Sequence, residues 1–316
     1  MKPKELTTLL VQTGSSWMED RAPRLGAALA YYAIFSVAPL LVIAIAVAGL
    51  VFGHEAAQHQ VVSQMGNLVG SEGAETLRTM IESASRSESG VLGTVLGVVM
   101  LLIGAIGLFA ELQDAMNTIW GVQVKPGRGI GGFIRDRLLS FGMVLGLAFL
   151  LLVSLVLSAA LTAILNYLGN RQGGVVGFVI NEVVSLVVFT LLFAMIFKFL
   201  PDAKIAWRDV WLGAAITALL FEVGKFLIGI YLGQAGIASA YGAAGSLAVL
   251  LVWLYYSAQI FLFGAEFTKV YANRYGSRIE PTENAVPVTR EARLEQGLAP
   301  ASVGNRERQR PEYSGR

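Results

Sequence analysis

The sequence contains no cysteine and few charged residues, and both shortages narrow the classes of protein it can belong to. Without cysteine there is no disulfide, no thiolate metal ligand and no cysteine nucleophile. Only 15% of the 316 residues are charged and 55% are hydrophobic, whereas a soluble domain usually carries about 25% charged residues. The net charge of +2 is too small for a basic field that would attract nucleic acid. The composition therefore indicates a protein whose main solvent is lipid.

Histidine is also scarce, since only His54 and His59 occur, in the segment HEAAQH. Zinc proteases use HExxH, in which a four-residue step places both imidazoles on one helix face. The five-residue step here turns the second histidine by about 140° away from the first. We therefore expect no metal site, and no other motif predicts a cofactor.

Six long apolar stretches dominate the chain. A helix needs about 20 apolar residues to cross a hydrocarbon core of about 30 Å. The stretches that meet this requirement are 27–53, 91–117, 138–165, 175–199, 210–232 and 244–269. The sequence thus predicts an all-α polytopic membrane protein with six transmembrane helices within residues 26–272. Within these spans, glycine pairs at 93/97, 142/146 and 229/233 predict close helix packing.

Three polar regions flank or interrupt the spans. Residues 1–25 form an amphipathic segment, expected as a short helix on the cytoplasmic surface of the bilayer. Residues 54–90 form the longest loop, with apolar residues at helical spacing, and we expect short helices outside the cytoplasm. Residues 273–316 are rich in charge and proline, which predicts a disordered cytoplasmic tail.

The basic residues favour one orientation. With both termini in the cytoplasm, the outside segments carry only Arg78, Arg86 and Arg171 among the Lys and Arg residues. Nearly all the others then lie inside, as the positive-inside rule demands. We expect a bacterial inner-membrane protein with six spans and both termini cytoplasmic.

Glu222 and Lys225 stand out because they lie midway along the fifth span, three residues apart. A charge at the bilayer centre costs roughly 2.5–3.5 kcal/mol on insertion scales. Two interpretations remain open. The pair is either a substrate- or ion-binding site that faces the bundle interior, or an internal ion pair that fixes helix packing.

Other polar side chains form stripes on three further spans. Glu111 and Asp114 end the second span, Gln259 and Glu266 lie on the sixth, and Tyr32 and Ser36 lie on the first. The purely structural interpretation is a solvated helix end for the two acidic residues of the second span and interhelical packing for the residues of the other two spans. Because all fall in the cytoplasmic half, we hypothesise that they line a wet vestibule that opens to the cytoplasm, with Glu222 and Lys225 at its floor.

Several blocks of sequence resemble the YihY/BrkB family of bacterial membrane proteins. They are LGAALAYYAIFSVAPLLVIAIAVAG at 25–49, ELQDAMNTIW at 111–120 and YGAAGSLAVLLVWLYYSAQIFLFGAEF at 241–267, with a further match at 199–233. The resemblance implies six spans, and members have carried the labels virulence factor and ribonuclease BN. It brings no catalytic residues, and this sequence lacks the metal-ligand cluster that would support a ribonuclease.

We therefore expect a transporter or a lipid-translocating protein with a polar cavity, and not an enzyme. The alternative is a non-transporting scaffold in envelope assembly, in which the loop 54–90 contacts partners. The expected partners are membrane lipids and a small-molecule, ion or lipid substrate, without nucleic acid. The oligomeric state stays open.

Overall fold

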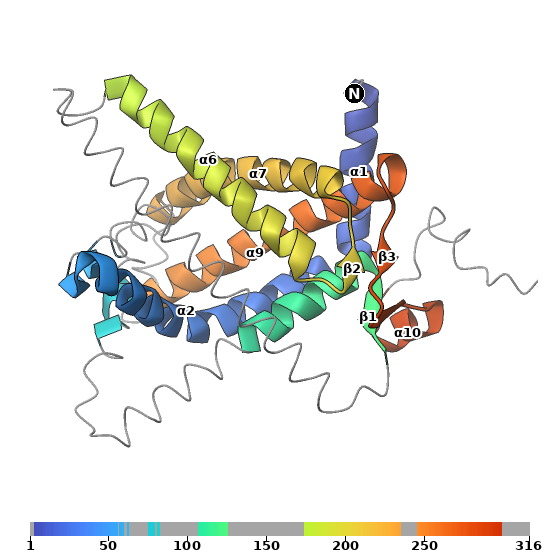
Figure 1. Ribbon diagram of the computed structural model, residues 1–316, viewed down its shortest axis with the longest axis horizontal. Coiled ribbons are helices and arrows are strands. Elements are labelled where there is room, and N and C mark those ends of the chain that lie inside the picture. The colour runs from blue at the N-terminus through green and yellow to red at the C-terminus, as the bar shows by residue number, and fades with distance from the viewer. Residues whose placement is uncertain are drawn as a thin grey trace, which may run out of the picture.

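A computed structural model shows a mostly helical molecule (Figure 1). The structure describes residues 3–55, 57–59, 62, 75–79, 81–82, 107–125, 174–234 and 245–298. Its long helices are α2 (Ala22–Phe52), α6 (Gly174–Phe199), α7 (Trp207–Gln234) and α9 (Gly245–Tyr275), and residues 107–120 form another helix. Helix α9 is central, because it packs against α7, α2 and the N-terminal helix α1 (Pro3–Glu19).

Three of the described helices contain stretches long and apolar enough to cross a membrane, namely Glu182–Phe199, Trp207–Tyr231 and Leu247–Tyr275. They correspond to the expected spans 175–199, 210–232 and 244–269. The expected span 27–53 falls within α2, and the end of the span 91–117 falls within the helix 107–120. The span 138–165 lies outside the described residues, so the number six stays a prediction.

The crossing of α7 and α9 depends on two glycines that face two threonines. A Cβ on Gly213 would overlap the side chain of Thr268, and a Cβ on Gly264 would overlap that of Thr217. Each threonine hydroxyl donates to the glycine carbonyl four residues earlier in its own helix, at 2.7 Å. The hydroxyls are thereby satisfied inside an apolar contact, and the two backbones approach closely, as small residues permit in membrane helices.

The structure describes no close contact for the glycine pair at 229/233. Within the described part of the chain, a Cβ on Gly229 would meet no atom within 4 Å. The close packing expected of this pair stays a prediction. The pairs 93/97 and 142/146 lie outside the described residues.

The C-terminal region corrects one expectation. We expected disorder from residue 273, but α9 continues to Tyr275 and is followed by β3 (Glu280–Pro281), β4 (Ala285–Pro287) and α10 (Arg290–Glu295). Strand β4 pairs antiparallel with β1 (Val122–Val124), and β3 pairs antiparallel with β2 (Ala203–Lys204). The segment is too polar to fold alone. It is ordered because its backbone hydrogen bonds are made with loops of the helical domain.

The segment that joins α9 to β3 is fixed by Asp209 in the first turn of α7. Its carboxylate accepts hydrogen bonds from the backbone N–H and the hydroxyl of Ser277, at 2.9 and 3.0 Å. A Cβ on Gly276 would overlap this carboxylate, which explains glycine at that position. The start of α7 and the end of α9 therefore lie at the same end of the molecule.

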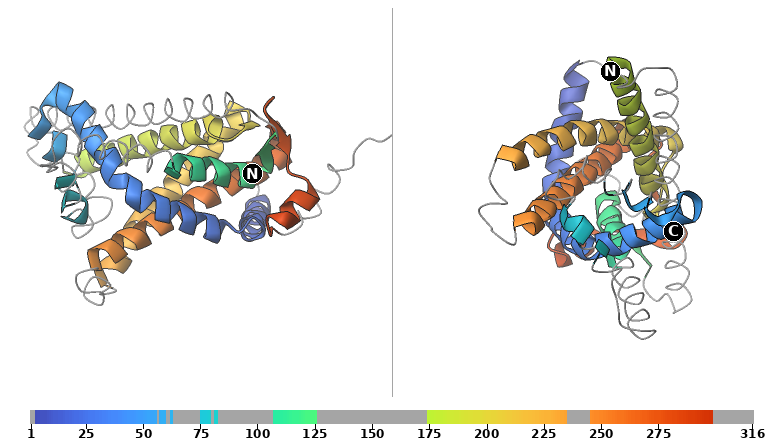
Figure 2. Two further views of the ribbon diagram at one scale, coloured as in Figure 1. Left: turned by 90° about the horizontal axis from the view of Figure 1, so that it is seen from below. Right: turned by 90° about the vertical axis from the view of Figure 1, so that its left-hand side faces the viewer.

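Helix α1 lies across this same end, crosswise to α7 (Figure 1), and is seen end-on from below (Figure 2). A sharp bend separates α1 from α2 at Arg21, which adopts the left-handed conformation with φ 52°. Pro23 then starts α2, where its fixed φ suits the first helical turn. The expected amphipathic segment 1–25 is thus a helix followed by the first turn of α2.

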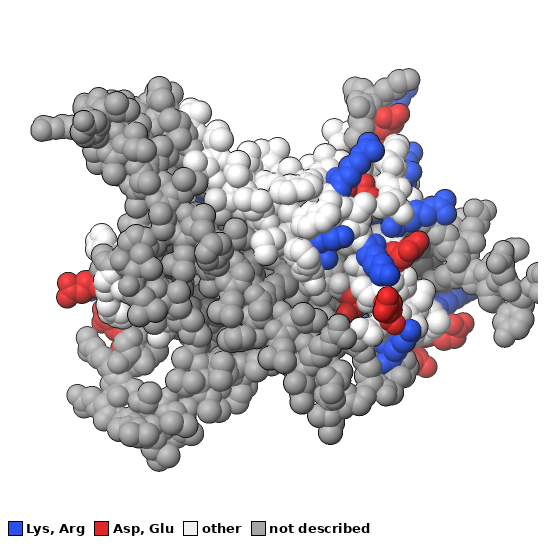
Figure 3. All heavy atoms as spheres, viewed as in Figure 1, with Lys and Arg blue, Asp and Glu red and all other residues white. Residues whose placement is uncertain are grey.

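Charge gathers at this end of the molecule, which we call the charged end (Figure 3). Its exposed basic residues are Lys4, Arg21, Arg24, Lys125, Lys204, Arg208, Arg274, Arg278 and Arg290. The described atoms in the upper middle of the view, next to the charged end, are white in Figure 3, as expected of helices that face lipid. In the expected loop 54–90, residues 57–59, 75–79 and 81–82 are helical, and Leu77 and Ile81 are buried.

The α7–α9 crossing yields a prediction with a control in the same helix. Gly213→Val places a branched side chain against Thr268, and overpacking of this kind costs typically about 1–3 kcal/mol. We expect the variant in detergent to have a lower midpoint of thermal unfolding than the wild type. The midpoint is measured by size-exclusion chromatography of heated samples. Gly229→Val should leave the midpoint nearly unchanged, because a Cβ there would meet no atom within 4 Å in the described part of the chain. Equal midpoints for the two variants would contradict the close crossing.

Candidate functional site

The expected ion pair in the middle of α7 is formed. Lys225 Nζ lies 2.5 Å from Glu222 Oε2, and the two side chains are 21% and 12% exposed. The other carboxylate oxygen of Glu222 accepts a hydrogen bond of 2.6 Å from Ser185 of α6. Both oxygens of Glu222 are therefore engaged, and the pair is held at the interface between α6 and α7.

Gln259 lies on α9 and faces the start of α2. Its amide nitrogen donates to the carbonyl oxygen of Pro23 at 3.5 Å. The absence of a side chain at Gly26 leaves the space that the amide occupies. The amide oxygen of Gln259 is buried and accepts no hydrogen bond from the described part of the chain.

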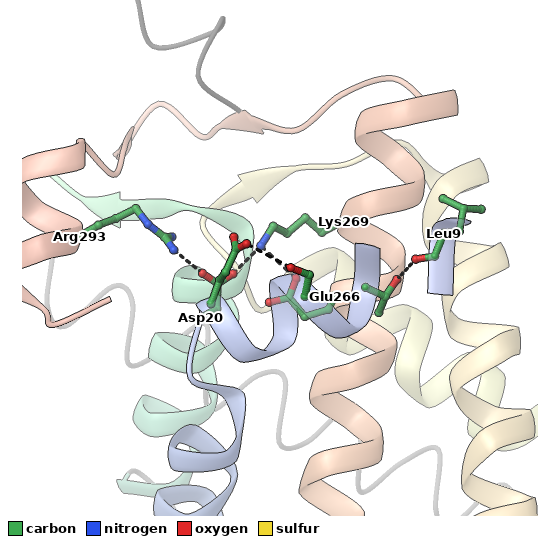
Figure 4. Close-up of polar contacts among 8 residues, drawn as sticks. Leu9, Asp20, Glu266, Lys269 and Arg293 are labelled. Atoms are coloured by element: carbon green, nitrogen blue, oxygen red, sulfur yellow. Dashed lines mark hydrogen bonds and ion pairs between the residues drawn. The ribbon is translucent and has the colours of Figure 1, made fainter. Parts of the chain in front are cut away.

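Glu266, about two helical turns further along α9, belongs to a buried charge cluster (Figure 4). We use the term charge cluster for Asp20, Glu266, Lys269 and Arg293. Lys269 Nζ lies 3.0 Å from Glu266 Oε2 and 2.5 Å from Asp20 Oδ2. Arg293 of α10 contacts the other oxygen of Asp20, at 2.6 Å. Two acidic side chains thus face two basic ones, and their attraction offsets part of the cost of burying them.

Asp20 connects the parts of this cluster, and its environment favours the charged form. Only 1% of Asp20 is exposed. Burial alone would raise the pKa of its carboxyl group, but the positive charges of Lys269 and Arg293 and the hydrogen bonds around it outweigh burial and lower that pKa. Asp20 is therefore a carboxylate in the folded protein over the whole physiological range.

The remaining expected residues lie where α2 meets the helix 107–120. The hydroxyl of Ser36 donates to the carbonyl oxygen of Tyr32 at 2.8 Å, and Ser36 is fully buried. The ring of Tyr32 lies against Gly107, and 39% of Tyr32 is exposed. On the helix 107–120, Glu111 is half-buried and Asp114 is exposed.

These positions do not form the single wall that the vestibule hypothesis requires. Helices α7 and α9 run antiparallel, with Gly213 opposite Thr268 and Gly224 opposite Ile260, so that Glu222 and Gln259 lie at about the same height. Their side chains nevertheless point to different neighbours, since Glu222 bonds to α6 and Gln259 bonds to α2. The structure therefore divides the eight expected residues among four places: the Glu222–Lys225 pair, Gln259 beside Pro23, Glu266 in the charge cluster, and the positions on α2 and the helix 107–120.

Comparison with known proteins identifies the family. Residues 13–289 match the sequence pattern of the family described as virulence factor BrkB. The chain belongs to the BrkB family. A UPF0761 membrane protein of Tolumonas auensis (strain DSM 9187 / NBRC 110442 / TA 4) is 31% identical over 254 residues, which cover 79% of this chain and 80% of that protein.

Other BrkB-family relatives are longer than this chain. A UPF0761 membrane protein of Pseudomonas aeruginosa (strain LESB58) is 28% identical over 251 residues, covering 79% of this chain and 59% of the relative. One of Azotobacter vinelandii is 30% identical over 257 residues, covering 79% and 60%. The matched region thus spans about six tenths of these relatives. No solved structure matches.

Sequence reasoning missed several polar residues of this BrkB-family chain that the structure connects. The sequence analysis did not single out Asp20, Lys269 and Arg293 of the charge cluster. Asp202, between α6 and α7, accepts from Asn117 at 2.9 Å and from Gln113 at 3.2 Å, and its N–H donates to Asn117 at 2.8 Å. Gln113 and Asn117 lie four residues apart in the block ELQDAMNTIW, which was the available signal. Their partner, more than eighty residues away, could not be inferred.

The charge cluster predicts a pH-dependent effect of Asp20→Asn. At neutral pH the variant removes the negative charge that Lys269 and Arg293 share, although Lys269 keeps its contact with Glu266. Removal of one partner from a buried pair costs roughly 3–5 kcal/mol. We expect a lower midpoint of thermal unfolding than that of the wild type. Because the pKa of Asp20 is lowered by folding, its stabilising effect is complete above the usual 3.8 and is lost as the pH falls through the folded-state pKa.

The measurement is the unfolding midpoint of both proteins between pH 3 and pH 8, and their difference should shrink at the acid end. Glu19→Gln is the matched control, because Glu19 is a half-buried neighbour that bonds to Ser15 on the same helix. Equal unfolding midpoints of wild type and Asp20→Asn at pH 7 would contradict the role given to Asp20.

Proposed function

We propose that this BrkB-family membrane protein is a transporter or a lipid-translocating protein, and that Glu222 and Lys225 form its central polar site. The observation that carries the proposal is the pair itself. It lies midway along a helix long enough to cross a membrane, between α6 and α7, with 21% of Lys225 and 12% of Glu222 accessible. Ionisable groups at such depth are costly and mark substrate or ion pathways.

The chemistry of the site suits a substrate that carries charge. When the ion pair opens, Lys225 offers an ammonium group to a phosphate or carboxylate, and Glu222 offers a carboxylate to an amine. The hydroxyl of Ser185 can remain on Glu222, at 2.6 Å in the closed pair. A zwitterionic lipid headgroup would engage both residues. The activity needs no covalent chemistry, and we propose a protein that is not an enzyme and does not act on nucleic acid.

The rival function is a scaffold in envelope assembly, and one observation favours it. Both oxygens of Glu222 are already engaged within the protein, as a packing role requires. In this case the pair would stabilise the contact between α6 and α7 and would bind nothing.

A charge exchange distinguishes the two functions. In the double variant Glu222→Lys with Lys225→Glu, an ion pair three residues apart can still form, so the unfolding midpoint should stay close to that of the wild type. If the pair binds substrate, the exchanged charges should lower the rate of lipid movement or substrate uptake at least tenfold. The rate of lipid movement is measured in vesicles that contain the purified protein and fluorescent phospholipids. It is the rate at which dithionite quenches the fluorescence of the labelled lipid.

Single variants complete the comparison. Glu222→Gln and Lys225→Met each remove one charge. Under the transport proposal, each variant should fold but lose the lipid movement or substrate uptake. Two results together would overturn the proposal in favour of the scaffold. The wild-type protein would move neither the labelled lipid nor an ionic substrate, and the exchange variant would be fully functional in cells.

We also propose that the protein lies in the bacterial inner membrane with the charged end in the cytoplasm. The proposal is supported by the exposed basic residues at that end, since such residues are retained on the cytoplasmic side. The contact between Asp20, before α2, and Arg293, after α9, brings both ends of the helical domain to the same side.

The absence of cysteine makes this orientation simple to test. A single cysteine in place of exposed Arg290 should resist a membrane-impermeant maleimide in intact cells and react after lysis. A cysteine in place of exposed Glu55, at the start of the loop 54–90, should react in intact cells. Labelling of both positions from the same side would contradict the orientation.

A further inference from the structure

Helix α1 carries an apolar surface that the protein only partly covers. Leu9 and Thr13 are fully buried against the helical domain, and Trp17 is packed against its core. Next to this buried face, four apolar side chains remain exposed. They are Leu6 at 45%, Leu10 at 43%, Val11 at 67% and Met18 at 63%. At 100° per residue they fall within an arc of about 140° that also contains Thr7, Gly14 and Trp17, and we call these four side chains the exposed strip.

The direction of the exposed strip follows from a contact between α1 and α9. Gln12 accepts a hydrogen bond of 3.1 Å from Arg274, in the last turn of α9, so the Gln12 side of α1 faces the tip of the charged end. On an ideal helix the centre of the exposed strip lies about 180° from Gln12. The exposed strip therefore faces back along α9, toward the apolar middle of the molecule.

The surroundings of α1 match the boundary between lipid and water. Trp207 and Trp211, in the first turns of α7 at the same end, are each 43% exposed, and tryptophan is enriched at this depth. Lys4, Arg21 and Arg24, on α1 and at its junction with α2, are exposed and can reach anionic headgroups. Helix α1 lies crosswise to α7, which is the orientation of a helix in the plane of a membrane surface (Figure 1).

We propose that the exposed strip is a lipid-binding surface, immersed in the bilayer leaflet at the charged end. The apolar arc of α1 is then divided between two solvents. Leu9, Thr13 and Trp17 pack on the protein, and Leu6, Leu10, Val11 and Met18 contact acyl chains below the headgroups. A helix of this kind is buried by about 5–10 Å in the boundary region. The salt bridge between Asp20 and Lys269 fixes the end of α1 to α9, so the helix cannot leave the surface independently.

Site-directed spin labelling of the full chain in vesicles of phosphatidylethanolamine and phosphatidylglycerol tests the proposal. Single cysteines replace Val11 or Met18 on the exposed strip, and Thr8 or Ser15 on the polar side of the same helix. All four positions are exposed, so differences between them report on the solvent rather than on burial in the protein. Size-exclusion chromatography verifies that each variant is folded.

At Val11→Cys and Met18→Cys we expect the label to be more accessible to oxygen than to a water-soluble nickel complex. The order should be reversed at Thr8→Cys and Ser15→Cys, with a severalfold change in the ratio of the two accessibilities. Equal access of the nickel complex to both pairs would place the exposed strip in water. Shielding of Val11 and Met18 from both reagents would mean that protein covers them. Either result overturns the proposal.

Discussion

The arrangement at the charged end depends on a single carboxylate that pairs with two cations. Asp20 forms ion pairs with Lys269 of the central helix α9 and with Arg293 of the C-terminal helix α10, each through a different carboxylate oxygen. Lys269 is only 12% exposed and cannot be left unpaired at such a site without a large desolvation cost. The junction between α1 and α2, the end of α9 and the C-terminal segment are therefore held in one relative position by electrostatics.

The C-terminal segment also holds the loops at the charged end together. Through β4 it pairs with β1 after the helix 107–120, and through β3 it pairs with β2 between α6 and α7. Asp202 adds a side-chain connection between the same two regions, because it bonds to both Gln113 and Asn117. Four helices that enter the membrane domain thus share one set of polar contacts outside it.

The sequence predicted the helices well because hydrophobic length is a local property, and the described helices coincide with the expected spans within a few residues at most boundaries. It also placed Glu222 beside Lys225, since a spacing of three residues on a helix ensures proximity. It did not predict which helix each polar residue faces. Gln259 and Glu222 share a depth, but their neighbours depend on the packing of distant segments. The order of the segment 276–298 was missed for a related reason, because its partners are loops far away in the sequence.

The reciprocal contacts of Gly213 with Thr268 and of Gly264 with Thr217 also limit how the protein can move. Each helix inserts a threonine into a notch of the other, so neither can slide or rotate without a steric clash. Helices α7 and α9 therefore behave as one rigid body. Under the proposed transport function, a path past Glu222 would then open by displacement of α6, which would break the hydrogen bond from Ser185.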